Sequence, residues 1–130
     1  MEQKDITKHS SASLSFLGDA VFSLLARERL ILSRDLSLGE YNKKLKNYVS
    51  ARAQSKIYRG LTDFLTEEEK AIMKRGRNAT SHSRAKGASV AEYRHATGVE
   101  ALFGWLRLTG QEERIKEIFE KCVEICDTMI

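Results

Sequence analysis

The sequence lacks proline altogether, and it has no apolar run near the length of about 18 residues that a membrane-spanning helix requires. The opening segment, MEQKDITKHS, also lacks the apolar stretch of a signal peptide. Cysteine is scarce: Cys122 and Cys126 stand four residues apart, a spacing that strains a disulfide within a helix. No further metal ligands are evident beside them in the sequence. We therefore expect two small buried thiols in a soluble, cytoplasmic protein without membrane contact.

The balance of charge favours a polyanionic partner. The chain of 130 residues has room for one domain and one core, and it carries a net charge of +4 with an isoelectric point near 9.1. The distribution is more informative than the sum, because the segment from Lys74 to Lys86 contains five Lys or Arg residues and no acid. A segment of this kind suits contact with phosphate groups.

Apolar residues recur at spacings of three and four, which predicts an all-α fold in a single domain. Gly60 is expected to end the second helix, and Thr66 with Glu69 forms a capping box, so Glu69 is assigned no catalytic role. The stripe expected to be buried on the first helix comprises Leu14, Leu17, Val21, Leu24 and Leu25. The predicted organisation is a frayed N-terminus over 1–12, helices over about 13–32, 40–59, 66–76, 90–108 and 111–127, and a loop over 76–89.

Two carboxylates lie within separate runs of small and apolar residues. Asp19 stands between Gly18 and Ala20, and Glu100 lies in the second run. An acid in such surroundings is costly unless it is paired, hydrogen-bonded or bound to a metal. Small neighbours would let two helices approach until both carboxylates reach one cation, and oxygen ligands with room for water suit Mg²⁺ or, as a substitute, Mn²⁺. The alternative for either acid is a buried carboxyl that caps a backbone or pairs with Arg94.

These two segments also carry a resemblance to a known family. Residues Phe16-Leu17-Gly18-Asp19-Ala20-Val21 resemble the core of the ribonuclease III signature, and Glu100-Ala101-Leu102-Phe103-Gly104 resembles that family's second motif. Residues 74–79 and 93–97 are similar to the Mini-III branch, which lacks a separate domain for binding double-stranded RNA. The resemblance implies an all-helical catalytic domain over 13–130, a homodimer with one site per subunit, and metal-dependent hydrolysis that leaves 5′-phosphate and 3′-hydroxyl ends.

The chain departs from ribonuclease III proper at two positions. Ser15 stands four residues before Asp19, and Thr97 three residues before Glu100, where that family usually has acids. The resemblance therefore assigns catalysis and metal binding to Asp19 and Glu100 alone, with Thr97 able to hold a metal-bound water. Mini-III enzymes resemble this chain in both absences. The apolar side chains of Phe16 and Phe22 belong either to the dimer interface or to the core.

The basic segment is the expected surface for the RNA backbone. A-form duplexes are recognised through shape, phosphates and 2′-hydroxyls, which basic and small polar side chains can contact. Ser81 would add a hydrogen bond, His82 and His95 are expected to be structural or solvated, and the alternative for the whole segment is a solubilising loop. The predicted RNA-binding residues are Lys74, Arg75, Arg77, Asn78, Arg84, Lys86 and Arg94.

The sequence is compatible with two functions. The leading hypothesis is an endoribonuclease that processes double-stranded stems of ribosomal RNA precursors in 23S maturation, with a large-subunit ribosomal protein as assisting partner; this substrate and partner are implied by the resemblance. The alternative is a catalytically silent RNA-binding or ribosome-associated module on the same fold. A helix-turn-helix DNA-binding protein is disfavoured, because the basic segment is too rich in glycine and serine for a recognition helix.

Overall fold

The fold is all-α, as predicted. The computed structural model describes residues 9–79 and 89–127, and in these ranges the chain forms helices and no strand. No helix within them is both long and apolar enough to cross a membrane. The helices are α2 (Ser11–Ser33), α3 (Leu38–Val49), α4 (Ala51–Leu61), α5 (Glu67–Asn78), α6 (Val90–Leu108) and α7 (Glu112–Asp127).

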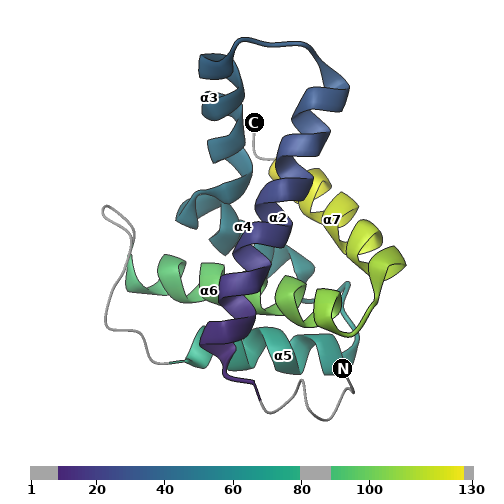
Figure 1. The fold of residues 1–130 in the computed structure, drawn as a ribbon. Helices are drawn as coiled ribbons and strands as arrows, with labels where there is room; N and C mark the ends of the chain where they lie inside the picture. Colours follow the sequence, from purple (N-terminus) through teal and green to yellow (C-terminus); the bar gives the residue numbers. More distant parts are fainter. Residues whose placement is uncertain (1–8, 80–88, 128–130) are drawn as a thin grey trace.

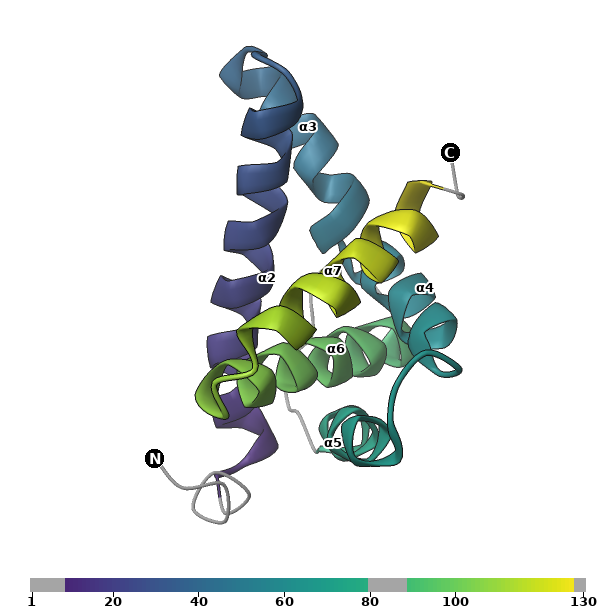
Figure 2. The same cartoon turned by 90° about the vertical axis from the view of Figure 1, so that its right-hand side faces the viewer.

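Helix α6 forms the centre of the molecule. The long helix α2 crosses it, α5 runs beneath it, and α4 and α7 pack on its remaining sides (Figures 1 and 2). From Ala101 to Leu106 every residue of α6 is buried, as expected for a helix surrounded by others. Trp105, only 1% exposed, fills the core, and the two cysteines of α7 are buried and unbonded as expected.

The crossing of α2 and α6 depends on two glycines. A Cβ atom added to Gly18 would lie 1.5 Å from the carbonyl oxygen of Glu100, and one added to Gly104 would lie 2.0 Å from that of Leu14. Real Cβ atoms do not approach that closely, so only glycine allows the two backbones to touch. This contact places Asp19, the residue after Gly18, beside Glu100.

The buried face of α2 differs from the predicted stripe. Leu24 is 58% exposed, whereas Leu17, Val21 and Leu25 are only partly buried. A count of large apolar residues overlooks glycine and alanine, yet these small residues permit the closest packing against α6. The face that is buried consists of Ser11, Leu14, Gly18, Phe22, Ala26 and Leu30.

The helices that flank the site also differ in their boundaries. The predicted second helix is broken at Ser50, which ends α3 and whose side chain caps α4 by accepting from the Ala53 amide at 3.2 Å. Gly60 lies inside α4 instead of ending it. Its lack of a side chain makes room for α7, since a Cβ there would lie 2.7 Å from the side chain of Ile125. Helix α5 continues through Asn78, so 76–78 belong to a helix and not to the predicted loop.

Candidate active site

Asp19 and Glu100 come together where α2 crosses α6. Ser15 lies one turn before Asp19 on α2, and its hydroxyl donates a hydrogen bond of 2.9 Å to Oε1 of Glu100. Glu100 is partly buried, whereas Asp19 is exposed at the rim. The structure therefore brings together the two acids that the sequence singled out, and Ser15 orients the deeper one.

The electrostatics of this pair are unusual. Burial raises the pKa of Glu100 to about 7, against the opposing effect of the Ser15 hydrogen bond and with a further contribution from the carboxyl of Asp19. Among the residues that the structure describes, neither acid forms an ion pair with Lys, Arg or His. The alternative of a Glu100–Arg94 pair is therefore not what the structure shows. Two carboxyl groups share one site, and no cation of the described chain balances them.

This arrangement fits a Mg²⁺ or Mn²⁺ ion. Within 9–79 and 89–127 no group of three or more His, Cys, Asp or Glu side chains is placed to hold a metal. An ion at this site would therefore have two carboxylate ligands from the protein, those of Asp19 and Glu100. Mg²⁺ is commonly held by one or two carboxylates and completes its shell with water and substrate phosphates. Thr97 donates its hydroxyl proton to the Tyr93 carbonyl at 3.0 Å, which leaves its oxygen able to accept from a water.

The predicted RNA-binding residues that the structure describes lie in two different settings. Arg77, Asn78 and Arg94 line one pocket with His95, and Lys74 is exposed on α5. Arg75 differs, because it donates to the Ser11 hydroxyl at 3.2 Å and to the His9 carbonyl at 2.6 Å and so anchors the start of α2. Ser81, His82, Arg84 and Lys86 lie outside the described residues.

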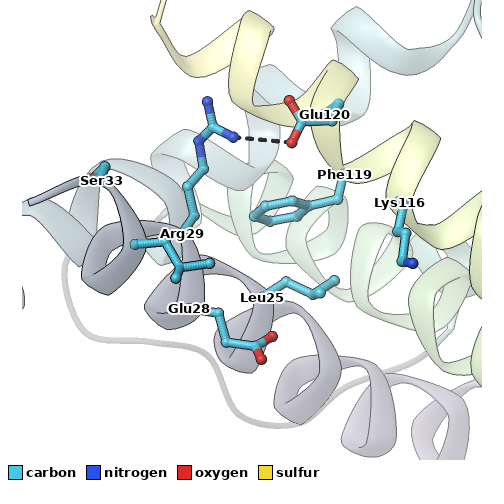
Figure 3. Close-up of a pocket in the computed structure, with 8 residues that line it drawn as sticks. Leu25, Glu28, Arg29, Ser33, Lys116, Phe119 and Glu120 are labelled. Carbon is cyan, nitrogen blue, oxygen red and sulfur yellow. Dashed lines mark hydrogen bonds and ion pairs between the residues drawn. The ribbon is translucent and has the colours of Figure 1, made fainter.

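A second concave surface lies away from the acids. It is a groove of about 470 Å³ between α2 and α7, and Figure 3 shows the Arg29–Glu120 ion pair of 3.0 Å at its rim. Leu25 and Phe119 form its floor. Neither Asp19 nor Glu100 lines it, so this groove is not the site where the carboxylates converge.

Comparison with known proteins identifies the family. The pattern described as the ribonuclease III domain matches residues 12–111, which include both acids. The chain belongs to the ribonuclease III family. It is accordingly an endoribonuclease, and the match covers the α2–α6 crossing on which the acid pair depends.

Relatives of this ribonuclease III family member cover nearly its whole length. Mini-ribonuclease 3 from Brevibacillus brevis is 41% identical, with 98% of each chain covered. Mini-ribonuclease 3 from a Thermoanaerobacter species is 39% identical over 98% of this chain and 89% of the relative. A crystal structure of a Fusobacterium nucleatum protein superposes with a TM-score of 0.84 at 35% identity, covering 92% of this chain and 98% of that one. The resemblance to the Mini-III branch is confirmed.

Proposed function

We propose that this endoribonuclease cleaves double-stranded RNA with a divalent cation held between Asp19 and Glu100. The observation that supports the proposal most strongly is the acid pair itself: two carboxyls in contact, one of them partly buried with a pKa of about 7, and no cation of the described chain beside them. A buried structural carboxylate is expected to pair with a cation of the fold, as Glu69 does with Arg114, whereas Glu100 receives the neutral hydroxyl of Ser15. Mg²⁺ is the expected ion, and Mn²⁺ the expected substitute.

The residues of the chain would act in three ways during cleavage. Asp19 and Glu100 would provide the anionic oxygens that hold the ion, and Ser15 would fix the orientation of Glu100 through its hydrogen bond. A bound ion would supply Lewis-acid stabilisation of the phosphodiester and would lower the pKa of a water molecule. Thr97 would position a water near the ion. Hydrolysis would leave a 5′-phosphate and a 3′-hydroxyl.

The proposed active form is a homodimer. Helix α2 exposes large apolar side chains on the face that does not pack on α6, and Phe16 is 84% exposed while Phe22 is in the core. Exposed apolar residues along one helix favour pairing with another protein surface. A two-fold axis there would place one site opposite each strand of a duplex. The exposed apolar residues of α2 are Phe16, Leu24, Ile31 and Leu32.

The finer assignment concerns the natural substrate. We infer that the enzyme trims stems of the ribosomal RNA precursor that gives 23S RNA, in the cytoplasm and with a large-subunit ribosomal protein as assisting partner. The support is the similarity to the Mini-III branch. A stem from that precursor should be cut faster than an unrelated duplex of equal length, and the ribosomal protein should raise its rate further; equal rates would refute the assignment.

The test of the activity is cleavage of an end-labelled RNA duplex by the purified chain, with Mg²⁺ and with EDTA. We expect cutting only with Mg²⁺, and losses of at least about a thousandfold in Asp19→Asn and Glu100→Gln, because each removes a charge that holds the ion. Cutting in EDTA, or full activity in both variants, would refute the proposed site. Tight duplex binding without cutting under Mg²⁺ or Mn²⁺ would favour the silent module, with Ser15 and Thr97 as the reason.

A further inference from the structure

A basic pocket lies between the end of α5 and the start of α6, and neither Asp19 nor Glu100 lines it. It has a volume of about 530 Å³, and Arg77 and Asn78 from the end of α5 face Arg94 and His95 from the start of α6 across it. Val90 and Ala91 complete its lining, and none of these lining residues is acidic. The pocket thus combines two arginines, an amide and an imidazole around one space.

Two residues of α4 fix the orientation of the His95 ring. Its ring stacks on Tyr58 with centroids 4.5 Å apart, and its Nδ1 lies 2.7 Å from the hydroxyl of the buried Ser55. The direction of this hydrogen bond depends on the tautomer of the ring, and a hydroxyl that donates to Nδ1 leaves the ring proton of the neutral imidazole on Nε2. In that tautomer a neutral His95 presents an N–H donor on the side of the ring away from Ser55.

The charges around this ring are of one sign. Burial and the nearby guanidinium groups of Arg59 and Arg77 lower the pKa of His95, which favours the neutral imidazole. Arg77 also lies over the Tyr58 ring, with its guanidinium carbon 5.8 Å from the centroid. Arg77 and Arg94 thus line the pocket beside His95, Arg59 on α4 adds a positive charge near the ring, and no lining residue is acidic. Such a surface is complementary to an anion with several oxygens.

We propose that this pocket is a subsite for one backbone phosphate of the RNA substrate, in which His95 Nε2 donates to a phosphate oxygen between Arg77 and Arg94. The inference rests on the proposed function, because it takes duplex RNA as the ligand. His95 precedes Glu100 by five residues, about 7.5 Å along the axis of α6. Five residues also turn the helix by about 140°, so His95 projects toward α4 while Glu100 projects toward α2, and the pocket would contact a part of the duplex other than the phosphate at the acid pair. Arg59 and His95, absent from the predicted RNA-binding set, become members of it.

Three single variants separate the contributions of the His95 N–H donor, the His95 ring and the Arg94 charge. His95→Phe keeps the stack on Tyr58 and removes the donor, whereas His95→Gln keeps a donor N–H at the position of Nε2. Arg94→Gln removes one charge from the rim. Lys116→Gln is the matched control, because Lys116 is an exposed cation on α7 that lines the groove between α2 and α7 and not the basic pocket.

The measurement is the affinity of the full chain for a blunt RNA duplex in EDTA, as a function of salt concentration. We expect His95→Phe to bind about fivefold to tenfold more weakly with an unchanged salt slope, and His95→Gln to recover most of that loss. Arg94→Gln should reduce the slope of log affinity against log salt by about one. Lys116→Gln should match the wild type.

Two readouts distinguish binding from a structural role. Thermal unfolding reports any loss of folding in His95→Phe, and the imidazole ¹⁵N signals of the wild type should show an Nε2–H tautomer whose Nε2 signal shifts on addition of the duplex. An unshifted signal, or His95→Phe binding as tightly as the wild type while both cleave RNA, would overturn the subsite and leave the proposed function intact. Absence of duplex binding by the wild type would overturn both. If inorganic phosphate alone saturated the Nε2 shift as tightly as the duplex, the pocket would be a site for free anions, and the proposal would be wrong.

Discussion

Two glutamates of this chain are shielded from solvent in opposite ways. Glu69 is 3% exposed and receives two hydrogen bonds of 2.8 Å from Arg114, besides the amide of its own capping box. Burial alone would raise its pKa, but the bonds from Arg114 and Thr66 outweigh it and hold the pKa below the ordinary value. Glu100 has a serine and a second acid instead, and its pKa rises to about 7.

The difference shows how a structural acid is told from a functional one. Glu69 has its cation within the fold, so its charge is already balanced and it joins α5 to α7. Glu100 has no such cation in the described chain, although glycine contacts bring its backbone against α2. The fold therefore stabilises the first charge and leaves the second to an ion from solution. Substitutions on the two sides of this contrast should therefore differ in their effects on stability and on cleavage.

The largest effect is expected where the helices that form the acid pair touch. Gly18→Ala places a methyl group against the backbone of Glu100, so α2 must move away from α6, at a cost of about 3 kcal/mol or more. Chemical denaturation and the cleavage assay should both show the loss. Gly39→Ala is the control, because a Cβ there meets nothing within 4 Å, and a Gly18→Ala chain as stable as that control would refute the packing argument.

Breaking the Arg114–Glu69 ion pair should lower the stability of the fold nearly as much and leave the rate of RNA cleavage unchanged. Arg114→Met leaves Glu69 buried without its cation and should lower the free energy of unfolding by about 3 kcal/mol. Glu69→Gln in the same chain should recover part of that loss. Below the unfolding temperature the rate of RNA cleavage should stay within about twofold of the wild type, since ΔΔG‡ is close to zero. A selective loss of cleavage would show that Glu69 is not purely structural.

The raised pKa of Glu100 predicts an opposite effect on stability. The pKa of this carboxyl rises from its ordinary 4.5 to about 7 in the folded chain, so between these values the folded chain holds a proton that the unfolded chain has lost. The stability that depends on protonated Glu100 is therefore fully present below about pH 4.5 and is lost as pH rises through about 7. Glu100→Gln should remove this loss and stabilise the metal-free protein at neutral pH by about 1–2 kcal/mol while abolishing cleavage. Denaturation curves from pH 4 to 8 in EDTA test this directly. If the variant were less stable than the wild type at pH 8, Glu100 would have a structural partner.

The smallest effect is expected from the hydroxyl that orients Glu100. Ser15→Ala removes the hydrogen bond to Oε1, so the pKa of Glu100 should rise further and cleavage should slow by about fivefold. The pH dependence of the cleavage rate measures both changes. Ser23→Ala on the same helix is the control, because its hydroxyl accepts from Arg27 and does not contact the acids. Equal behaviour of the two variants would remove Ser15 from the site.

The sequence was sufficient for features that depend on neighbouring residues or on a known motif. The all-α class, the Thr66–Glu69 capping box and the α6 boundaries follow from local spacing, and the approach of Asp19 to Glu100 follows from two small-residue motifs. Features formed by distant segments were missed. Arg114 lies 45 residues from Glu69, and the contact of Ser55 with His95 spans 40. The close approach of Gly60 to Ile125 was missed for the same reason, because its cause lies on another helix.

The central claim is that Asp19 and Glu100 together bind a divalent cation that balances their charge. The most direct test is thermal unfolding of the full chain just above pH 7 across a range of Mn²⁺ concentrations, for the wild type, Asp19→Asn and Glu100→Gln. Because an ion that binds only the folded state raises the unfolding temperature with its concentration, we predict a progressive rise in the wild type. Neither variant should show it. An equal rise in all three proteins, or no rise in the wild type, would contradict the account.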